Sequence, residues 1–103
     1  SFQNDSQALS LSQEIIHNNM HICLKKDEKI FVFMPFMHSE SIKIQTLSVK
    51  YFSELGIKKN IEYAYKHYDV INKFGRFPHR NIILKRESTL GELKFLKNHG
   101  SRF

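Results

Sequence analysis

The chain has 103 residues, of which 41% are hydrophobic and 13% aromatic, so we expect one folded domain over residues 1–103 and exclude wholesale disorder. Its formal net charge is +6, but the lysines are scattered or paired and match no nucleic-acid motif, so we do not expect a nucleic acid as partner. No apolar run approaches the roughly 18 residues that span a membrane, no signal peptide is recognised, and the single cysteine excludes an internal disulfide, so we expect a cytoplasmic protein.

The first predicted helix runs from Ser6 to Leu24, where apolar residues recur at helical spacing. His17 and His21 lie one turn apart on its polar face, which is a spacing typical of metal ligands. The glutamate of the zincin pattern is missing between them, so we interpret both histidines as part of a solvent-facing stripe and predict no metal. Cys23 falls on the apolar face and is expected in the core.

The stretch from Lys29 to Met34 is apolar and short, and its pattern fits a buried strand as well as a buried helix. We predict a helix because no second convincing strand is available to pair with it. Asp27 is the expected N-cap. Pro35 should end the helix at Met34, because proline lacks an N–H and disfavours helical geometry in the preceding residue. Ser39 is then a suitable N-cap for the next helix.

Two longer helices are predicted in the middle of the chain, from Ser41 to Leu55 and from Ile61 to Phe74. Gly56 and Gly75 are the expected ends, because glycine tolerates the left-handed geometry of a helix C-terminus. Asn60 is the expected N-cap of the second helix. This helix carries only one narrow charged stripe, so we expect it to be buried on two sides, as in stacked helix pairs. The stripe consists of Glu62, Lys66, Asp69 and Lys73.

The last part of the chain combines a proline, an apolar run and a capping motif. Pro78 suits the first position of a short helix that directs the apolar run 82–84 inward. Thr89 and Glu92 form a T-x-x-E capping box that opens a final helix, and Gly100 is expected to follow its end. The chain therefore predicts an all-α protein of five or six helices joined by short turns.

Two motifs carry a resemblance to a known family: P-F-M-H-S-E at residues 35–40 and F-G-R-F-P-H-R-N at residues 74–81. With the helices between them, they are similar to the C-terminal half of the bacterial family known as domain of unknown function nine-two-four. The resemblance covers most of the chain and implies a tetratricopeptide-like fold, a right-handed array of antiparallel helix pairs. Such an array is usually a binding scaffold with a concave groove. The family's earlier half, which carries another Phe-Pro-Arg-Asn type motif, is absent from this chain.

The two motifs also supply the candidate site. No arginine precedes Arg76, and the placement of Arg76 and Arg80 around F-P-H indicates bidentate pairing that lysine cannot copy. Two interpretations remain open. Either Arg80 clamps Glu40 or Asp69 inside the protein, or the motifs bind a protein segment or a small anionic ligand. The candidate ligand-binding residues are His38, Ser39, Glu40, Arg76, His79, Arg80 and Asn81.

A catalytic alternative uses the same residues. His38 or His79, with an ordinary pKa near ~6.5, would act as general acid or base, and Glu40 would orient it or accept a proton. This is the arrangement of a hydrolase-like or transferase-like enzyme acting on a small molecule. Ser39 is the nearest nucleophile, but it is expected to serve as a cap. We therefore place a binding module ahead of an enzyme, and no cofactor is indicated.

Overall fold

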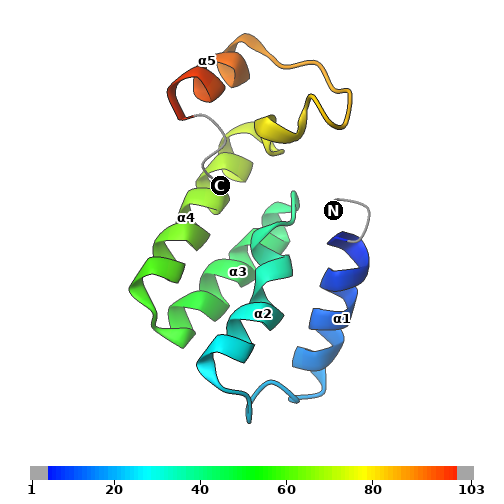
Figure 1. Ribbon diagram of the computed structural model, residues 1–103, viewed down its shortest axis with the longest axis vertical. Coiled ribbons are helices and arrows are strands. Elements are labelled where there is room, and N and C mark those ends of the chain that lie inside the picture. The colour runs from blue at the N-terminus through cyan, green and yellow to red at the C-terminus, as the bar shows by residue number, and fades with distance from the viewer. Residues whose placement is uncertain (1–4, 100–103) are drawn as a thin grey trace.

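The computed structural model describes residues 5–99, and all regular structure in this range is helical (Figure 1). This confirms the predicted all-α class and the choice of helix over strand for the apolar stretch before Pro35. None of the described helices combines the length and the apolar character needed to cross a bilayer. The elements are α1 (Asp5–His17), α2 (Lys26–Met37), α3 (Ile42–Leu55), α4 (Lys58–Phe74), the short 3-10 helix η2 (Pro78–Arg80) and α5 (Leu90–His99).

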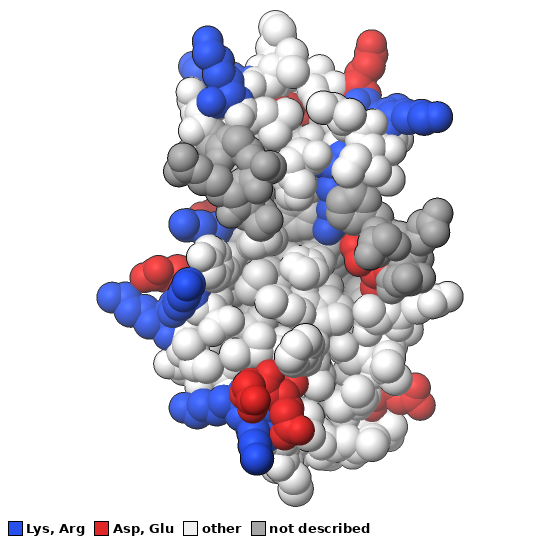
Figure 2. Space-filling model, viewed as in Figure 1, with Lys and Arg blue, Asp and Glu red and all other residues white. Residues whose placement is uncertain are grey.

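The first four helices form a row in which each helix packs against the next one along the chain. In Figure 1 the row runs from α1 on the right to α4 on the left, and α5 lies beyond the upper end of α4. The segment between α4 and α5 contains η2, which contacts α5. On the face drawn in Figure 2 the basic side chains stand apart from one another and form no continuous stripe.

The core has two hydrophobic clusters, one within the row and one under the C-terminal segment. The two clusters meet along α4, because Ala64 belongs to the first and Val70 to the second. The buried members of the first are Phe33, Met37, Phe52, Leu55 and Ala64. The buried members of the second are Val70, Ile71 and Phe77, with Phe74 and Phe95 packed against them.

The first helix is shorter than predicted. It ends at His17, and the chain continues through a turn in which Asn19 has a left-handed backbone, with φ of 57°. Asparagine tolerates this conformation because its short polar side chain bonds locally. His17 and His21 therefore do not share a helical face. The prediction that Cys23 lies in the core is wrong, because this cysteine is exposed.

Pro35 lies inside α2, so the prediction that the helix ends at Met34 is wrong. Proline removes the hydrogen bond that residue 35 would donate to the carbonyl of Phe31. Phe31 is 81% exposed, so it lies on the side of the helix where water can bond that carbonyl. The helix then continues only to Met37, and the His38 N–H donates to the Met34 carbonyl at 3.2 Å.

The N-caps differ from the predicted ones. At α2 the N–H of the cap residue donates to Glu28 Oε1 at 2.9 Å, a reciprocal bond of the kind found in capping boxes. At α3 the Ile44 N–H donates to the hydroxyl of the cap serine at 3.5 Å. The residue before α4 makes no side-chain cap bond. The observed caps are Lys25, Ser41 and Ile57, in place of the predicted Asp27, Ser39 and Asn60.

Glycines end α3 and α4 as predicted. Gly56 and Gly75 have φ of 83° and 74°, the left-handed region that favours glycine. The prediction that α4 is buried on two sides is wrong, because Tyr63 and Tyr65 are 38% and 49% exposed. Two lysine ammonium groups lie over the Tyr63 ring at 5.7 and 5.9 Å from its centre. Lysine side chains therefore cover this face in place of a second helical layer.

Around η2 one prediction fails, and just beyond it another is confirmed. The apolar run 82–84 is between 42% and 87% exposed, so it does not point inward. The short helix η2 turns its proline and arginine into the protein instead. The capping box of α5 is present, because the Thr89 N–H donates to Glu92 Oε1 at 2.9 Å and the Glu92 N–H donates to Thr89 Oγ1 at 3.1 Å. Gly100 lies outside the described residues.

Candidate functional site

The two sequence motifs meet at one corner of the protein. Glu40, which follows α2, accepts a hydrogen bond of 2.7 Å from the backbone N–H of Phe77. Arg80 of η2 donates from Nη2 to the carbonyl of His38 at 2.9 Å. The fold therefore brings the end of α2 against η2, although α3 and α4 separate them in the chain.

Glu40 is clamped by an arginine that lies outside both motifs. Arg86 Nη1 lies 3.0 Å from Glu40 Oε1, and Arg86 Nη2 lies 3.1 Å from Oε2. Partial burial alone would raise the pKa of Glu40, but the hydrogen bonds from Arg86 and from the Phe77 N–H hold it below its ordinary value. A carboxylate held in this way is a poor proton acceptor. The bidentate partner of Glu40 is therefore Arg86, whereas the internal-clamp interpretation had named Arg80.

Arg86 also joins Asn81 to the same network. Its Nε donates to Asn81 Oδ1 at 3.0 Å, and its Nη2 donates to the Phe77 carbonyl at 3.2 Å. Asn81 is 1% exposed and donates from Nδ2 to Ser88 Oγ at 2.9 Å. The oxygen and the nitrogen of its amide are thus both bonded within the protein. Asn81 was predicted to bind a ligand, and here it links Arg86 to Ser88.

Arg76 holds the last helix in the same manner. Its Nε and Nη2 donate to the two carboxylate oxygens of Glu92 at 2.8 and 2.7 Å, and Nη2 also donates to the Glu87 carbonyl at 2.6 Å. These bonds from Arg76, together with those from Thr89, lower the pKa of Glu92 to about 2. Two of the three described arginines therefore have bidentate carboxylate partners inside the chain.

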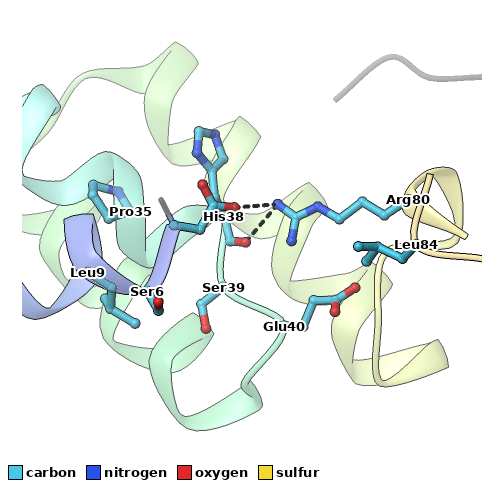
Figure 3. Close-up of a pocket in the computed structure, with 9 residues that line it drawn as sticks. Ser6, Leu9, Pro35, His38, Ser39, Glu40, Arg80 and Leu84 are labelled. Carbon is cyan, nitrogen blue, oxygen red and sulfur yellow. Dashed lines mark hydrogen bonds and ion pairs between the residues drawn. The ribbon is translucent and has the colours of Figure 1, made fainter. Parts of the chain in front are cut away.

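Arg80 is placed differently, because it borders a cavity. The residue is 9% exposed, and its guanidinium lies 4.7 Å from the centre of the Phe77 ring. Its Nη2 lies 3.6 Å from Asp5 Oδ2, at the start of α1. Figure 3 shows Arg80 reaching across this corner towards His38. The cavity, termed here the corner cavity, measures about 300 Å³ and is lined by Asp5, Ser6, Leu9, Pro35, His38, Ser39, Glu40, Arg80 and Leu84.

A buried histidine that the sequence analysis missed lies beside this corner. His67 of α4 is 5% exposed and donates from Nδ1 to the Tyr63 carbonyl at 2.8 Å. Its ring centre lies 6.2 Å from that of His38 and 5.5 Å from that of Phe77. Position 67 falls on the same row of α4 as the buried Ala64, and that spacing was the available signal.

Burial and nearby positive charge keep these histidines neutral. Desolvation lowers the pKa of His67 to about 4, against the effect of its bond to the Tyr63 carbonyl, and the neighbouring histidines and Arg80 add to the lowering. Desolvation also lowers the pKa of His38 and of His79, and Arg80 acts in the same direction on both. The predicted acid or base residues His38 and His79 are therefore uncharged at neutral pH.

The path of the chain at the corner depends on Ser39 and on a second residue that was missed. Ser39 Oγ accepts a hydrogen bond of 3.1 Å from the N–H of Ser41, the N-cap residue of α3. Gln45 is fully buried and donates from Nε2 to the carbonyls of Met37 and Ser39, each at 2.7 Å. It thereby satisfies one carbonyl at the last residue of α2 and one just after the helix. Within residues 5–99, no group of three histidine, cysteine or acidic side chains is arranged to hold a metal ion.

The chain matches a family model described as "Bacterial protein of unknown function (DUF924)" over residues 1–100. It also resembles the structure of a protein of unknown function, ATU0120, from Agrobacterium tumefaciens, with a TM-score of 0.86 and 34% sequence identity. The similarity covers 91% of this chain and 53% of that one, so the chain spans about half the length of the related structure. A search of curated proteins gave no significant match.

Proposed function

This chain belongs to the bacterial DUF924 family, and we propose that it is a helical scaffold whose corner cavity binds a small anionic ligand through Arg80. The observation that carries the proposal is the contrast among three arginines. Arg76 and Arg86 each hold a carboxylate of this chain in a bidentate pair at 2.7 to 3.1 Å. Arg80 instead lines the corner cavity.

The guanidinium of Arg80 is held ready for a ligand. The His38 carbonyl fixes one of its nitrogens, and the Phe77 ring supports its face. A positioned arginine loses little freedom when it binds a carboxylate or a phosphate, so more of the interaction energy appears as affinity.

Among the described neighbours of Arg80, Asp5 is the acidic group that a ligand would replace. Its separation of 3.6 Å from Arg80 Nη2 exceeds the roughly 2.7–2.9 Å of a charge-assisted hydrogen bond. The side chain of Asp5 is also 39% exposed, whereas that of Arg80 is 11% exposed. A ligand carboxylate or phosphate can therefore take the place of Asp5 without moving the arginine.

The size and lining of the cavity favour a small molecule over a protein segment. A volume of about 300 Å³ lies at the lower end of the range for ligand pockets. Leu9, Pro35 and Leu84 supply apolar walls, so the ligand should carry a short hydrocarbon part beside its anionic group. We place this binding in the cytoplasm, where an exposed free thiol such as that of Cys23 stays reduced.

The test is a thermal melt of the full chain with phosphate, succinate and butyrate as probes. A probe at about a hundred times its dissociation constant adds roughly 2.7 kcal/mol, which raises the melting temperature by about 12 °C. Arg80→Lys should abolish the shift, because lysine cannot reproduce the planar fork. Arg76→Lys is the matched control, because Arg76 pairs with Glu92 and does not line the corner cavity. It should lower the starting temperature but keep the shift. A shift that survives Arg80→Lys would refute the proposal.

A further inference from the structure

A second cavity lies between the first half of α2 and the last turns of α3, away from the corner. It measures about 240 Å³. None of the site residues predicted from the sequence lies in it. Its histidine, His21, was predicted to lie on a polar helix face. The lining residues are His21, Ile22, Lys29, Phe33, Tyr51, Glu54 and Leu55.

Three parts of the chain build an apolar wall in this cavity. Phe33 of α2 is 4% exposed, and its ring stacks on that of Tyr51 of α3 at 5.1 Å between centres. The ring of His21, from the turn after α1, meets Phe33 edge-on at 6.2 Å. Leu55 adds a buried aliphatic side chain. The wall therefore suits a flat aromatic or branched apolar group, which packs well against ring faces and edges.

Two opposite charges border the same cavity. Lys29 lies one helical turn before Phe33, so both side chains extend from one face of α2. Glu54 lies in the last turns of α3 and is exposed. Neither Lys29 nor Glu54 makes an ion pair within residues 5–99. An ammonium and a carboxylate therefore face the cavity without being neutralised by each other.

His21 adds a polar atom that also needs a partner. Its Nδ1 is buried and has no hydrogen-bond partner in the part of the chain that the structure describes. Buried polar atoms are almost always bonded, and exceptions call for an explanation at that site. Because this nitrogen is enclosed in the free protein, a rotation of the His21 ring would have to bring it to the cavity, where a ligand carboxylate reached by Lys29 would accept its hydrogen bond.

We propose that this second cavity binds a small zwitterion of the chemical class of the aromatic α-amino acids. The ligand carboxylate lies at Lys29 and His21, its ammonium at Glu54, and its side chain against Phe33 and Tyr51. A simple anion or a simple amine would leave one of the two protein charges without a partner. A zwitterion with an apolar side chain matches both charges and the wall together, within a cavity smaller than a drug-sized ligand needs.

The test is calorimetric titration of the full chain with L-phenylalanine and with its two half-ligands, 3-phenylpropanoate and 2-phenylethylamine. L-Phenylalanine should bind, and each half-ligand should bind at least about tenfold more weakly, because each lacks one charge-assisted contact. Glu54→Gln should lower the affinity for L-phenylalanine by about tenfold and leave the affinity for 3-phenylpropanoate unchanged. Glu62→Gln, which removes an exposed glutamate of α4, is the matched control and should change neither.

Arg80→Lys separates this site from the corner cavity, and it should leave the affinity for L-phenylalanine unchanged. The circular dichroism spectrum of Glu54→Gln should match that of the wild type, because the residue is exposed and unpaired in the described chain. Three results would overturn the proposal: no heat of binding with millimolar L-phenylalanine, equal affinity for all three compounds, or an affinity for L-phenylalanine that Glu54→Gln does not change.

Discussion

Stability should fall steeply between pH 7.5 and pH 5 because His67 is buried as a neutral group. The ring is 5% exposed and lies among groups that resist a further positive charge: His38 after α2, and His79 and Arg80 of η2. In the unfolded chain the same imidazole is in water and titrates near its ordinary pKa of 6.5. Acid therefore protonates the unfolded state first and draws the equilibrium towards it.

The size of the effect follows from the two pKa values of His67. The folded value is about 4 and the unfolded value 6.5. Because the folded pKa is lowered, the contribution is fully present above the unfolded value and is lost as pH falls towards the folded one. At about 1.36 kcal/mol per pKa unit the complete loss is about 3 kcal/mol, and about 2 kcal/mol of it is reached by pH 5. The lowered pKa values of His38 and His79 act in the same direction.

The histidines and the carboxylates affect stability in different pH ranges, so their contributions can be measured separately. Glu40 and Glu92 also have lowered pKa values, but they start to lose their contribution only near their ordinary value of 4.5. Urea unfolding at pH 7.5, 6 and 5, followed by far-UV circular dichroism, measures the free energy of unfolding in the window above them. His67→Gln should remove about 2 kcal/mol of the decline from pH 7.5 to pH 5.

His17→Gln is the matched control, because His17 is exposed at the end of α1 and its loss should leave the decline as in the wild type. A proton NMR titration of the imidazole gives a direct reading, with a midpoint near pH 4 expected for His67. If His67→Gln loses as much stability towards pH 5 as the wild type does, His67 is not the source of the decline.

Two further predictions concern the corner and a helix end. Glu40→Gln should lower the free energy of unfolding by about 2 kcal/mol in urea titrations. The change breaks the bidentate pair with Arg86, and Arg86 and the Phe77 N–H then compete for the one amide oxygen. An unchanged urea midpoint would show that the clamp does not stabilise the fold. Gly56→Ala should lower the free energy of unfolding by about 1 kcal/mol. The loss comes from the φ of 83° alone, because an added Cβ meets no atom within 4 Å. Gly56→Asn should cost less. A melting temperature equal to that of the wild type in the alanine variant would contradict the second prediction.

The helices were predictable wherever local chemistry alone decides. The glycine ends of α3 and α4 and the Thr89–Glu92 capping box depend on residues within one turn, so the sequence contains all the information needed. Pro35 was misread because its effect on a helix depends on where the freed carbonyl points. With Phe31 on the solvent side, α2 continues through the proline. That direction is set by packing against α3 and not by residues 31–35.

The candidate site was predictable in place but not in the roles of its arginines. Arg76, Arg80 and Arg86 lie within one short segment and have the same side-chain chemistry, so which of them meets Glu40 depends on how the chain turns after η2. It turns at Lys85, which has a left-handed backbone with φ of 56°. The Arg86 N–H then returns to the Asn81 carbonyl at 2.8 Å. A glycine there would have marked this reversal, and a lysine does not.

The turn at Lys85 determines which arginine pairs with Glu40 and which one lines the corner cavity. Because Arg86 is carried back to Glu40, it forms the bidentate pair with the motif carboxylate, and Arg80 acts on that carboxylate only at longer range. Arg80 is then left to face the cavity beside Asp5, on a different helix and with a longer separation of 3.6 Å. From the sequence, the internal clamp and the ligand site were alternative roles for Arg80. In the fold Arg86 forms the clamp, and Arg80 lines the proposed ligand site. Exchanging the roles of the two arginines would require rebuilding the turn at residue 85 and not only the side chains.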